Sequence, residues 1–457
     1  MNTYKSSLIV CALLFMGSHY GVAQAQDADI PSTESDTLQA AEPSDTRAVA
    51  QATVNTAAVV APTEEAEAEE AGEPDMMDPH TVSGGISFRP GSGLRIQSDD
   101  GAFSVTTRFR VQILHQVDLE DEEDPTQQFM LRRARIQFGG HFFGEDNRYK
   151  LQLALSPRDL GIRDNFTGTP RQSPLLDYYL EFRQIRDLTL RVGQYKVPHN
   201  RQRVTSSGNL QMVDRSIVNS EFNLDRDLGF DVRSRDLFGL DMLRYNLGVF
   251  MARGRGSVGD DDFGMMYLAR LELLPLGIFK DYREADFERG PARLAIGLGA
   301  AYIDRARRDR GVRGSVPADG GTTDTVHFVA DATFLAGGFS AETEFMMRSG
   351  SRNVGDATDD MGNPIAEAAP RGGWGLMVQA GYLLSSTPFE VSARYGMIRP
   401  TGEMGESALS ESNELGLGLS YYFAEHPFKL QFDAFRLWNE DADAADHRLR
   451  LQLQASL

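Results

Sequence analysis

The chain has 457 residues, with 46 basic and 66 acidic side chains, a formal net charge of −20 and a single cysteine. This length is enough for one large barrel or for two to three ordinary domains. Because Cys11 lies in an N-terminal segment that we expect to be removed, the mature protein has no thiol, which excludes disulfides and cysteine-ligated metal sites.

Residues 1–25 have the pattern of a secretory signal peptide. Lys5 precedes a short apolar run over residues 7–17, and a small-x-small cleavage site ends at Ala25. The apolar run is too short to span a membrane, and polar residues follow it. We therefore expect the mature chain to begin at Gln26.

Residues 26–83 are rich in Ala, Glu, Pro, Thr and Ser. Between positions 27 and 78 there are fourteen acidic residues and one basic residue, Arg47. This composition predicts a disordered acidic linker in the periplasm, which acts either as a tether or as a solvated tail without a partner. The linker carries most of the excess negative charge, so the net charge says little about the rest of the chain.

From about residue 84 the sequence changes to alternating segments of about ten residues, separated by clusters of Gly, Pro, Asp and Asn. Sixteen strands are predicted, an even number in the range of bacterial outer-membrane barrels. They cover residues 104–117, 129–141, 147–156, 175–184, 188–196, 227–235, 241–252, 264–274, 292–303, 324–335, 338–348, 373–384, 388–398, 412–424, 427–438 and 447–457. Short and long connections tend to alternate, as in an outer-membrane barrel with turns at one rim and loops at the other. We therefore predict that residues 84–457 form an all-β, 16-stranded antiparallel transmembrane barrel in the outer membrane.

Arginines alternate with apolar residues in the first predicted strands. Arg133 and Arg135 alternate with Ala134 and Ile136, and a period of two places the two kinds on opposite faces of a strand. A soluble core cannot bury several arginines without partners, whereas a barrel wall with lipid outside and water inside carries them readily. The predicted inward-facing arginines are Arg108, Arg110, Arg133, Arg135, Arg183, Arg191, Arg233 and Arg235.

Two positions do not follow simply from this pattern. Strict alternation points Arg132 into lipid, which costs roughly 2–4 kcal/mol near the midplane. We expect that it lies near a rim, that a β-bulge shifts the register, or that it faces a neighbouring subunit. Asp177 is a candidate lumen residue that either holds arginines in place or is a rim charge.

Six segments carry a resemblance to a known family. They are residues 131–136 (LRRARI), 177–183 (DYYLEFR), 190–198 (LRVGQYKVP), 226–230 (RDLGF), 248–250 (GVF) and 269–271 (ARL). Their order and spacing resemble the phosphate-selective porin O/P family of Gram-negative outer membranes. The resemblance implies a trimeric, 16-stranded porin whose third extracellular loop folds into an arginine-lined channel.

By this resemblance the inward-folded loop covers residues 197–225. The pore-lining candidates that it adds are Lys196, Arg201, Arg203, Arg215 and Arg226. Guanidinium groups suit such a pore because they stay charged and bind phosphate or carboxylate oxygens in pairs. The predicted function is diffusion of small anions, phosphate or similar, through this lumen, with a homotrimer in the lipid bilayer as the assembly.

Several alternatives stay open at this level. The predicted barrel has only Lys150, Lys196, Lys280 and Lys429, so the preferred anion is not fixed. A general porin of low selectivity would pair its arginines with loop carboxylates, and a plugged binding or adhesion barrel would not conduct. The sequence has no Gly-x-Ser-x-Gly or His-Glu-x-x-His motif. We therefore expect neither an enzyme nor a metal, organic cofactor or nucleic-acid partner.

Overall fold

The computed structural model describes residues 85–120, 124–160, 173–256, 264–402, 407–439 and 445–457. The predicted signal peptide and acidic linker, residues 1–83, lie outside these ranges. Within the described part of the chain, no helix is both long and apolar enough to cross a membrane.

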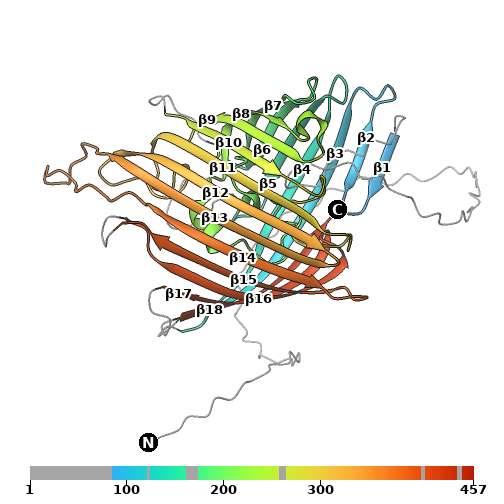
Figure 1. Ribbon diagram of the computed structural model, residues 1–457. Coiled ribbons are helices and arrows are strands. Elements are labelled where there is room, and N and C mark those ends of the chain that lie inside the picture. Colours follow the sequence, from blue (N-terminus) through green and yellow to red (C-terminus); the bar gives the residue numbers. More distant parts are fainter. Residues whose placement is uncertain (1–84, 121–123, 161–172, 257–263, 403–406, 440–444) are drawn as a thin grey trace, which may run out of the picture. The chain divides into compact units, whose positions relative to one another are not determined.

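Sixteen antiparallel strands, β3 to β18, form a closed barrel (Figure 1). Each strand pairs with the next one along the chain, and β18 pairs back onto β3, with Ser456 opposite Arg110. Every predicted strand overlaps one of these sixteen, so the predicted antiparallel 16-stranded barrel is confirmed. The strands are β3 (Ser104–Leu119), β4 (Thr126–His141), β5 (Asn147–Ala154), β6 (Leu175–Phe182), β7 (Thr189–Lys196), β8 (Arg226–Ser234), β9 (Leu243–Phe250), β10 (Met266–Leu273), β11 (Arg293–Ala306), β12 (Thr322–Ala336), β13 (Phe339–Asn353), β14 (Gly373–Leu383), β15 (Phe389–Pro400), β16 (Ser412–Ala424), β17 (Phe428–Trp438) and β18 (Ala445–Ser456).

A short hairpin precedes the barrel strands and was not predicted. Its strands are β1 (Gly85–Arg89) and β2 (Gly93–Gln97). β2 pairs with the first residues of β3, from Ser104 to Thr107, beyond the point where β18 ends. The hairpin therefore covers the part of the β3 edge that the last strand leaves open. Each of its strands has about half the length of a membrane-spanning strand, which is why a search for long alternating segments missed them.

The two faces of the barrel wall differ in polarity. On β18, Leu449, Leu451 and Leu453 are exposed, whereas Arg450 and Gln452 are buried inside. Exposed apolar and enclosed polar side chains are the reverse of the arrangement in a soluble protein. An outer surface of this kind matches the hydrocarbon of a bilayer.

A β-bulge explains the position of Arg132. Gln112 of β3 pairs with Arg133, but the next residue, Ile113, pairs with Leu131, which leaves Arg132 as the extra residue of β4. Its side chain therefore lies on the inner side, where it forms an ion pair with Asp214. Of the three explanations that the sequence left open, the structure shows the bulge.

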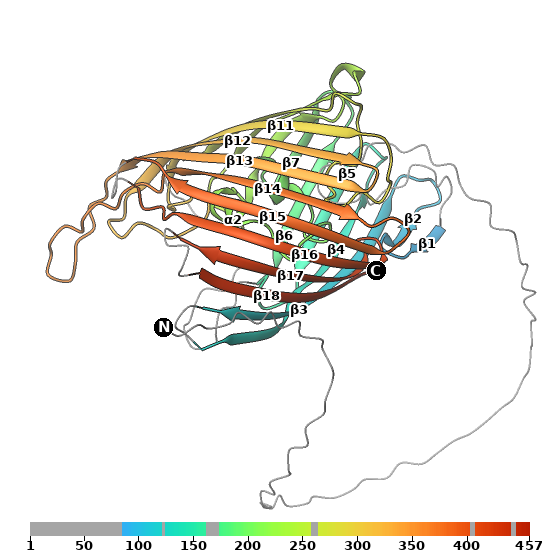
Figure 2. The ribbon, with the colours of Figure 1, turned by 60° about the horizontal axis from the view of Figure 1, so that its bottom comes forward.

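Residues 197–225, here called the inner loop, lie within the ring of strands and contain α1 (Arg201–Val204) and α2 (Ile217–Phe222) (Figure 2). α2 contacts β13, β14, β15 and β16. Glycines on β14 make room for the loop, because a Cβ at Gly375 would lie 2.9 Å from Val218 and one at Gly381 would lie 2.3 Å from Gln211.

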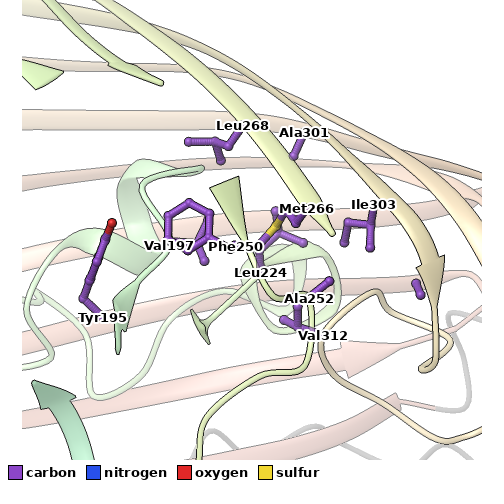
Figure 3. Packing of buried hydrophobic residues seen from close by; sticks show 11 residues of the cluster. Tyr195, Val197, Leu224, Phe250, Ala252, Met266, Leu268, Ala301, Ile303 and Val312 are labelled. Carbon is purple, nitrogen blue, oxygen red and sulfur yellow. The ribbon is translucent and has the colours of Figure 1, made fainter. Parts of the chain in front are cut away.

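An apolar cluster fixes both ends of the inner loop to the inside of the wall. Val197 and Leu224 pack with Phe250, Met266 and Ile303 (Figure 3). Each fully buried side chain of this size contributes roughly 1.5–3 kcal/mol. The interior is therefore partly apolar, and the cluster lies where the loop leaves β7 and returns to β8.

A second segment, residues 274–292 between β10 and β11, also turns inward and is here called the inner turn. Tyr282, Glu284 and Asp286 in it are buried. The main-chain N–H of Glu284 donates to the carbonyl of Asn209, and its carboxylate accepts the N–H of Gln211 at 2.8 Å. The inner turn and the inner loop therefore support each other inside the barrel.

A 3₁₀ turn, η1 (Leu237–Gly239), lies between β8 and β9.

Candidate functional site

The inner loop is held to opposite sides of the barrel. On β17, the Lys429 ammonium donates to the carbonyl of Leu210 at 2.6 Å, and the carboxylate of Asp433 accepts the N–H of Val213 at 3.0 Å. On the side of β10 and β12, Arg201 pairs with the barrel wall. The loop therefore crosses the lumen and divides its cross-section.

Arg201 corrects one prediction. It was expected to line a pore, but its side chain has 0% exposure and is enclosed by Asp331 at 2.8 Å, Asp281 at 2.6 Å and Glu272 at 3.3 Å. Its guanidinium also lies over the ring of Tyr282, 4.7 Å from the ring centroid. A group enclosed in this way cannot meet a solute, so Arg201 anchors the loop. Removing one partner of a buried ion pair typically costs about 3–5 kcal/mol.

The second half of the loop has its own anchor. Glu221 of α2 forms ion pairs with Arg348 of β13 and with Arg371, and Arg310 lies 3.5 Å from its second oxygen. Arg348 is itself almost fully buried. One carboxylate of the loop, paired with arginines of β13 and of connections between strands, thus holds α2. At α1 the arrangement is reversed, because the loop supplies the arginine.

An opening of about 300 Å³ remains between the inner loop and the wall. Its lining is dominated by guanidinium groups, with two carboxylates, Asp214 and Glu414. The arginines that line it are Arg132, Arg133, Arg158, Arg203, Arg215, Arg313, Arg394, Arg448 and Arg450. Three of these, Arg133, Arg203 and Arg215, were among the predicted pore-lining residues.

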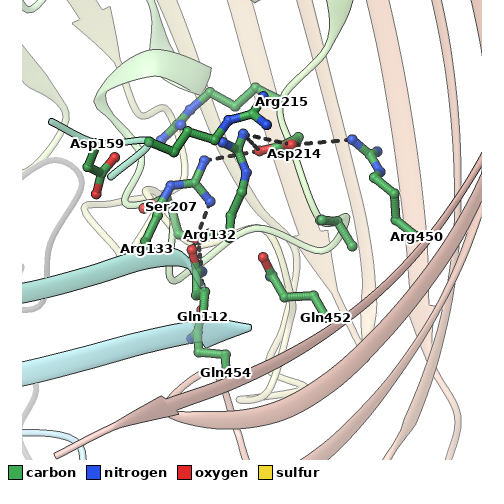
Figure 4. Close-up of polar contacts among 12 residues, drawn as sticks. Gln112, Arg132, Arg133, Asp159, Ser207, Asp214, Arg215, Arg450, Gln452 and Gln454 are labelled. Carbon is green, nitrogen blue, oxygen red and sulfur yellow. Dashed lines mark hydrogen bonds and ion pairs between the residues drawn. The ribbon is translucent and has the colours of Figure 1, made fainter. Parts of the chain in front are cut away.

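Asp214 projects from the inner loop into this opening (Figure 4). Its Oδ1 accepts from Arg132 at 2.8 Å and from Arg133 at 3.0 Å, and its Oδ2 lies 3.3 Å from Nη1 of Arg450. The three arginines come from β4 and β18, which flank β3 in the barrel wall. One carboxylate is therefore shared by three guanidinium groups, of which Arg450 also pairs with Asp433 at 2.7 Å.

Arg203 and Arg215 border the opening from the loop. Arg215 donates to the carbonyls of Gln202 at 2.6 Å and Thr205 at 2.5 Å. Arg203 is paired with Asp225. Among the described residues, no carboxylate lies within salt-bridge distance of Arg215. Burial lowers the pKa of its guanidinium to about 10, which leaves it charged at neutral pH.

A second group of predicted residues lies on β4, β6 and β8. Arg135 pairs with Asp159 at 2.7 Å, and Arg226 pairs with Asp177 at 2.6 Å. Lys150 lies 3.6 Å from the same Asp177 carboxylate. Asp177 therefore holds basic side chains in place, which is one of the two roles that the sequence allowed.

A third group lies on β6, β7 and β8. Glu181 is buried and pairs with Arg183 and, at 2.5 Å, with Arg191. Arg235 lies 3.7 Å from Glu181, and Arg233 pairs with Asp231 at 2.6 Å. Most predicted arginines are therefore inside the barrel, in groups that each contain a carboxylate.

Three further predicted residues contact uncharged oxygens. Arg108 donates to the carbonyl of Ser92 at 2.8 Å, and Arg110 donates to the hydroxyl of Ser206 in the inner loop at 2.9 Å. Lys196, at the start of the loop, donates to the carbonyl of Val204 at 2.9 Å. Arg110 and Lys196 thus connect wall and loop, and their role toward a solute stays a prediction.

Sequence reasoning missed part of the opening. Arg448 and Arg450 alternate with leucines on the last strand, so the period-two rule that selected Arg133 and Arg135 could have selected them too. Arg132 needed the bulge, which the sequence does not reveal. No sequence signal places Asp214 against β4 and β18.

Comparison with known proteins gives one family. The model of the family described as phosphate-selective porin O and P matches residues 105–456. No curated protein sequence matches the chain.

Solved structures resemble the barrel at low sequence identity. An anion-selective porin from Comamonas acidovorans has 12% identity and a TM-score of 0.48, over 78% of this chain and 100% of that one. OmpT of Vibrio cholerae with loop L8 deleted has 14% identity and a TM-score of 0.46, over 77% and 99%. OpdQ of Pseudomonas aeruginosa has 13% identity and a TM-score of 0.42, over 77% and 97%.

Proposed function

Because the chain belongs to the phosphate-selective porin O and P family, we propose that it passes small anions by diffusion through an arginine-lined lumen narrowed by the inner loop. It is an outer-membrane porin, a multi-pass β-barrel channel and not an enzyme. We propose three further features: the channel prefers anions, the inner loop narrows it, and the arginines of the opening act on the solute.

The charge of the opening carries the proposal. Among the described residues, nine guanidinium groups and two carboxylates line about 300 Å³. Three of these arginines also pair with carboxylates behind the lining, Arg203 with Asp225, Arg448 with Asp118 and Arg450 with Asp433, and an excess of positive charge remains. Guanidinium groups stay charged at physiological pH and bind oxyanions in pairs. A charged cleft of low-dielectric walls raises the local concentration of ions of opposite sign, so anions are favoured over cations at this point.

The size of the opening supports passage of small solutes. At about 30 Å³ for each water in the liquid, 300 Å³ corresponds to about ten waters. A chloride, a phosphate or a small carboxylate with part of its hydration shell fits this space. A 16-stranded barrel without an inward segment leaves a far wider aqueous channel, so the inner loop accounts for the narrowing.

A general porin of low selectivity is the second candidate, and one observation favours it. Many lumen arginines outside the opening have carboxylate partners, as in the pairs of Arg135 with Asp159, Arg226 with Asp177, and Arg233 with Asp231. Such pairs have no net charge, so selectivity would depend on the opening alone.

We further propose a homotrimer, to be tested by cross-linking in native membranes.

Reversal potentials of the full-length porin in planar bilayers, under a gradient of potassium chloride, test the proposal. We expect an anion preference that falls when Arg133 at the opening is changed in Arg133→Gln. The matched control is Arg186→Gln, which removes the same charge from a side chain that is 64% exposed in the turn between β6 and β7. A cation-selective channel, no conductance, or equal selectivity in the two variants would refute the proposal.

A further inference from the structure

Asp214 occupies the place in the opening where an anion would bind. Arg132, Arg133 and Arg450 direct guanidinium nitrogens at its two carboxylate oxygens, at 2.8, 3.0 and 3.3 Å (Figure 4). The other carboxylate of the opening, Glu414, is paired with Arg394 at 3.1 Å on another part of the wall. Several guanidinium groups around one pair of oxygens is how proteins bind a free carboxylate or phosphate.

The position of the loop backbone does not depend on this carboxylate. The N–H of Val213 is held by Asp433 at 3.0 Å, and the carbonyl of Asp214 accepts from Arg394 at 2.8 Å. Both contacts use main-chain atoms and would persist without the Asp214 charge. The carboxylate is therefore not needed to keep the loop in place, whereas its charge acts directly on the arginines of the opening.

We propose that Asp214 is a tethered counter-ion that competes with mobile anions for Arg132, Arg133 and Arg450, and so sets how tightly the opening holds them. This inference rests on the proposed anion-porin function. An anion that enters must share these arginines with the fixed carboxylate, which weakens its binding and speeds its release. A channel needs this balance, because a solute that binds too tightly leaves too slowly.

The ionisation of Asp214 supports this role. Burial raises its pKa, but Arg132, Arg133 and Arg450 lower it more, and the net effect holds the pKa of Asp214 well below its usual range. The tethered carboxylate is thus ionised at neutral pH.

The test compares two neutralising variants of the full-length porin. Asp214→Asn removes the carboxylate from the opening. Glu425→Gln is the matched control, because it removes the same charge from a side chain that is 54% exposed in the turn between β16 and β17 and does not line the opening. Single-channel conductance is measured against potassium chloride concentration, and then with inorganic phosphate added as a blocker of the chloride current.

We expect Asp214→Asn to lower the half-saturating chloride concentration, and the phosphate concentration that halves the chloride current, by about tenfold. This is the effect of one unit charge about 3 Å away through water. Glu425→Gln should leave both values unchanged, and Asp214→Glu, which keeps the carboxylate, should stay close to wild type.

Two results would overturn the inference. One is a half-saturating chloride concentration that is unchanged or raised in Asp214→Asn. The other is a larger and less selective conductance in that variant, which would mean that the carboxylate only holds the loop. If the wild-type channel shows no anion preference, the proposed function is refuted. If the wild-type channel prefers anions but Asp214→Asn does not bind them more tightly, only the proposed counter-ion role of Asp214 is refuted.

Discussion

Changing Arg201 to methionine tests whether the inner loop is held by buried ion pairs. Arg201, with Arg244 and Arg270, neutralises three buried carboxylates, those of Glu272, Asp281 and Asp331. Arg201→Met keeps a long apolar side chain but leaves three carboxylates with two arginines. One unpaired buried charge costs about 3–5 kcal/mol. Because the barrel strands keep their hydrogen bonds, we expect this cost to fall on the docking of the loop and not on the barrel.

A cost of 3–5 kcal/mol corresponds to roughly a hundred- to several-thousandfold rise in the undocked population of the loop. Hydrogen exchange in residues 197–225 should accelerate within that range, with little change in the barrel strands. Single-channel records should show transitions to a larger conductance. Arg201→Lys should restore part of the docking, since an ammonium replaces the charge but not the geometry of the fork. Loop exchange and conductance equal to wild type in Arg201→Met would refute the reasoning.

Three further predictions follow from other parts of the barrel. Gly381→Leu should displace the inner loop, because even a Cβ there lies 2.3 Å from the Gln211 amide. Overpacking of this kind costs about 1–3 kcal/mol, and limited proteolysis should cleave the loop faster than in a Gly85→Leu control, at a site with ordinary φ and nothing within 4 Å. Equal rates would count against close packing. Anion preference should be constant from pH 5 to 8 and should decline as pH rises toward 10. The reason is that Arg215, whose pKa is lowered to about 10, loses its positive charge in that range. A change of the reversal potential near pH 6.5 would instead implicate a histidine. Removing residues 85–97 should expose the β3 edge from Ser104 to Thr107 and lower the temperature at which the barrel unfolds on a gel, whereas an unchanged temperature would show that the hairpin does not stabilise the seam.

The barrel could be predicted from the sequence because each wall strand has an alternating pattern of apolar and polar residues. Alternation with a period of two and the turn residues between strands located all sixteen barrel strands, and the same period placed Arg133 and Arg135 on the inner face. The bulge at Arg132 could not be predicted, since it depends on which residues of β3 and β4 pair. The enclosure of Arg201 and the position of Asp214 depend on contacts between residues 71 to 236 positions apart, for which the sequence offers no local signal.

The contacts of the inner loop also bear on the order of assembly. The carbonyl of Gly208 accepts from Gln454, 246 residues later in the chain, and the carbonyl of Leu210 accepts from Lys429. These partners are in place only after the last strand has paired with β3 and closed the ring. Contacts of such long sequence separation form late, because the entropy of closing the intervening chain must be overcome first. The contacts of the loop with β17 and β18 are therefore completed only when the barrel closes.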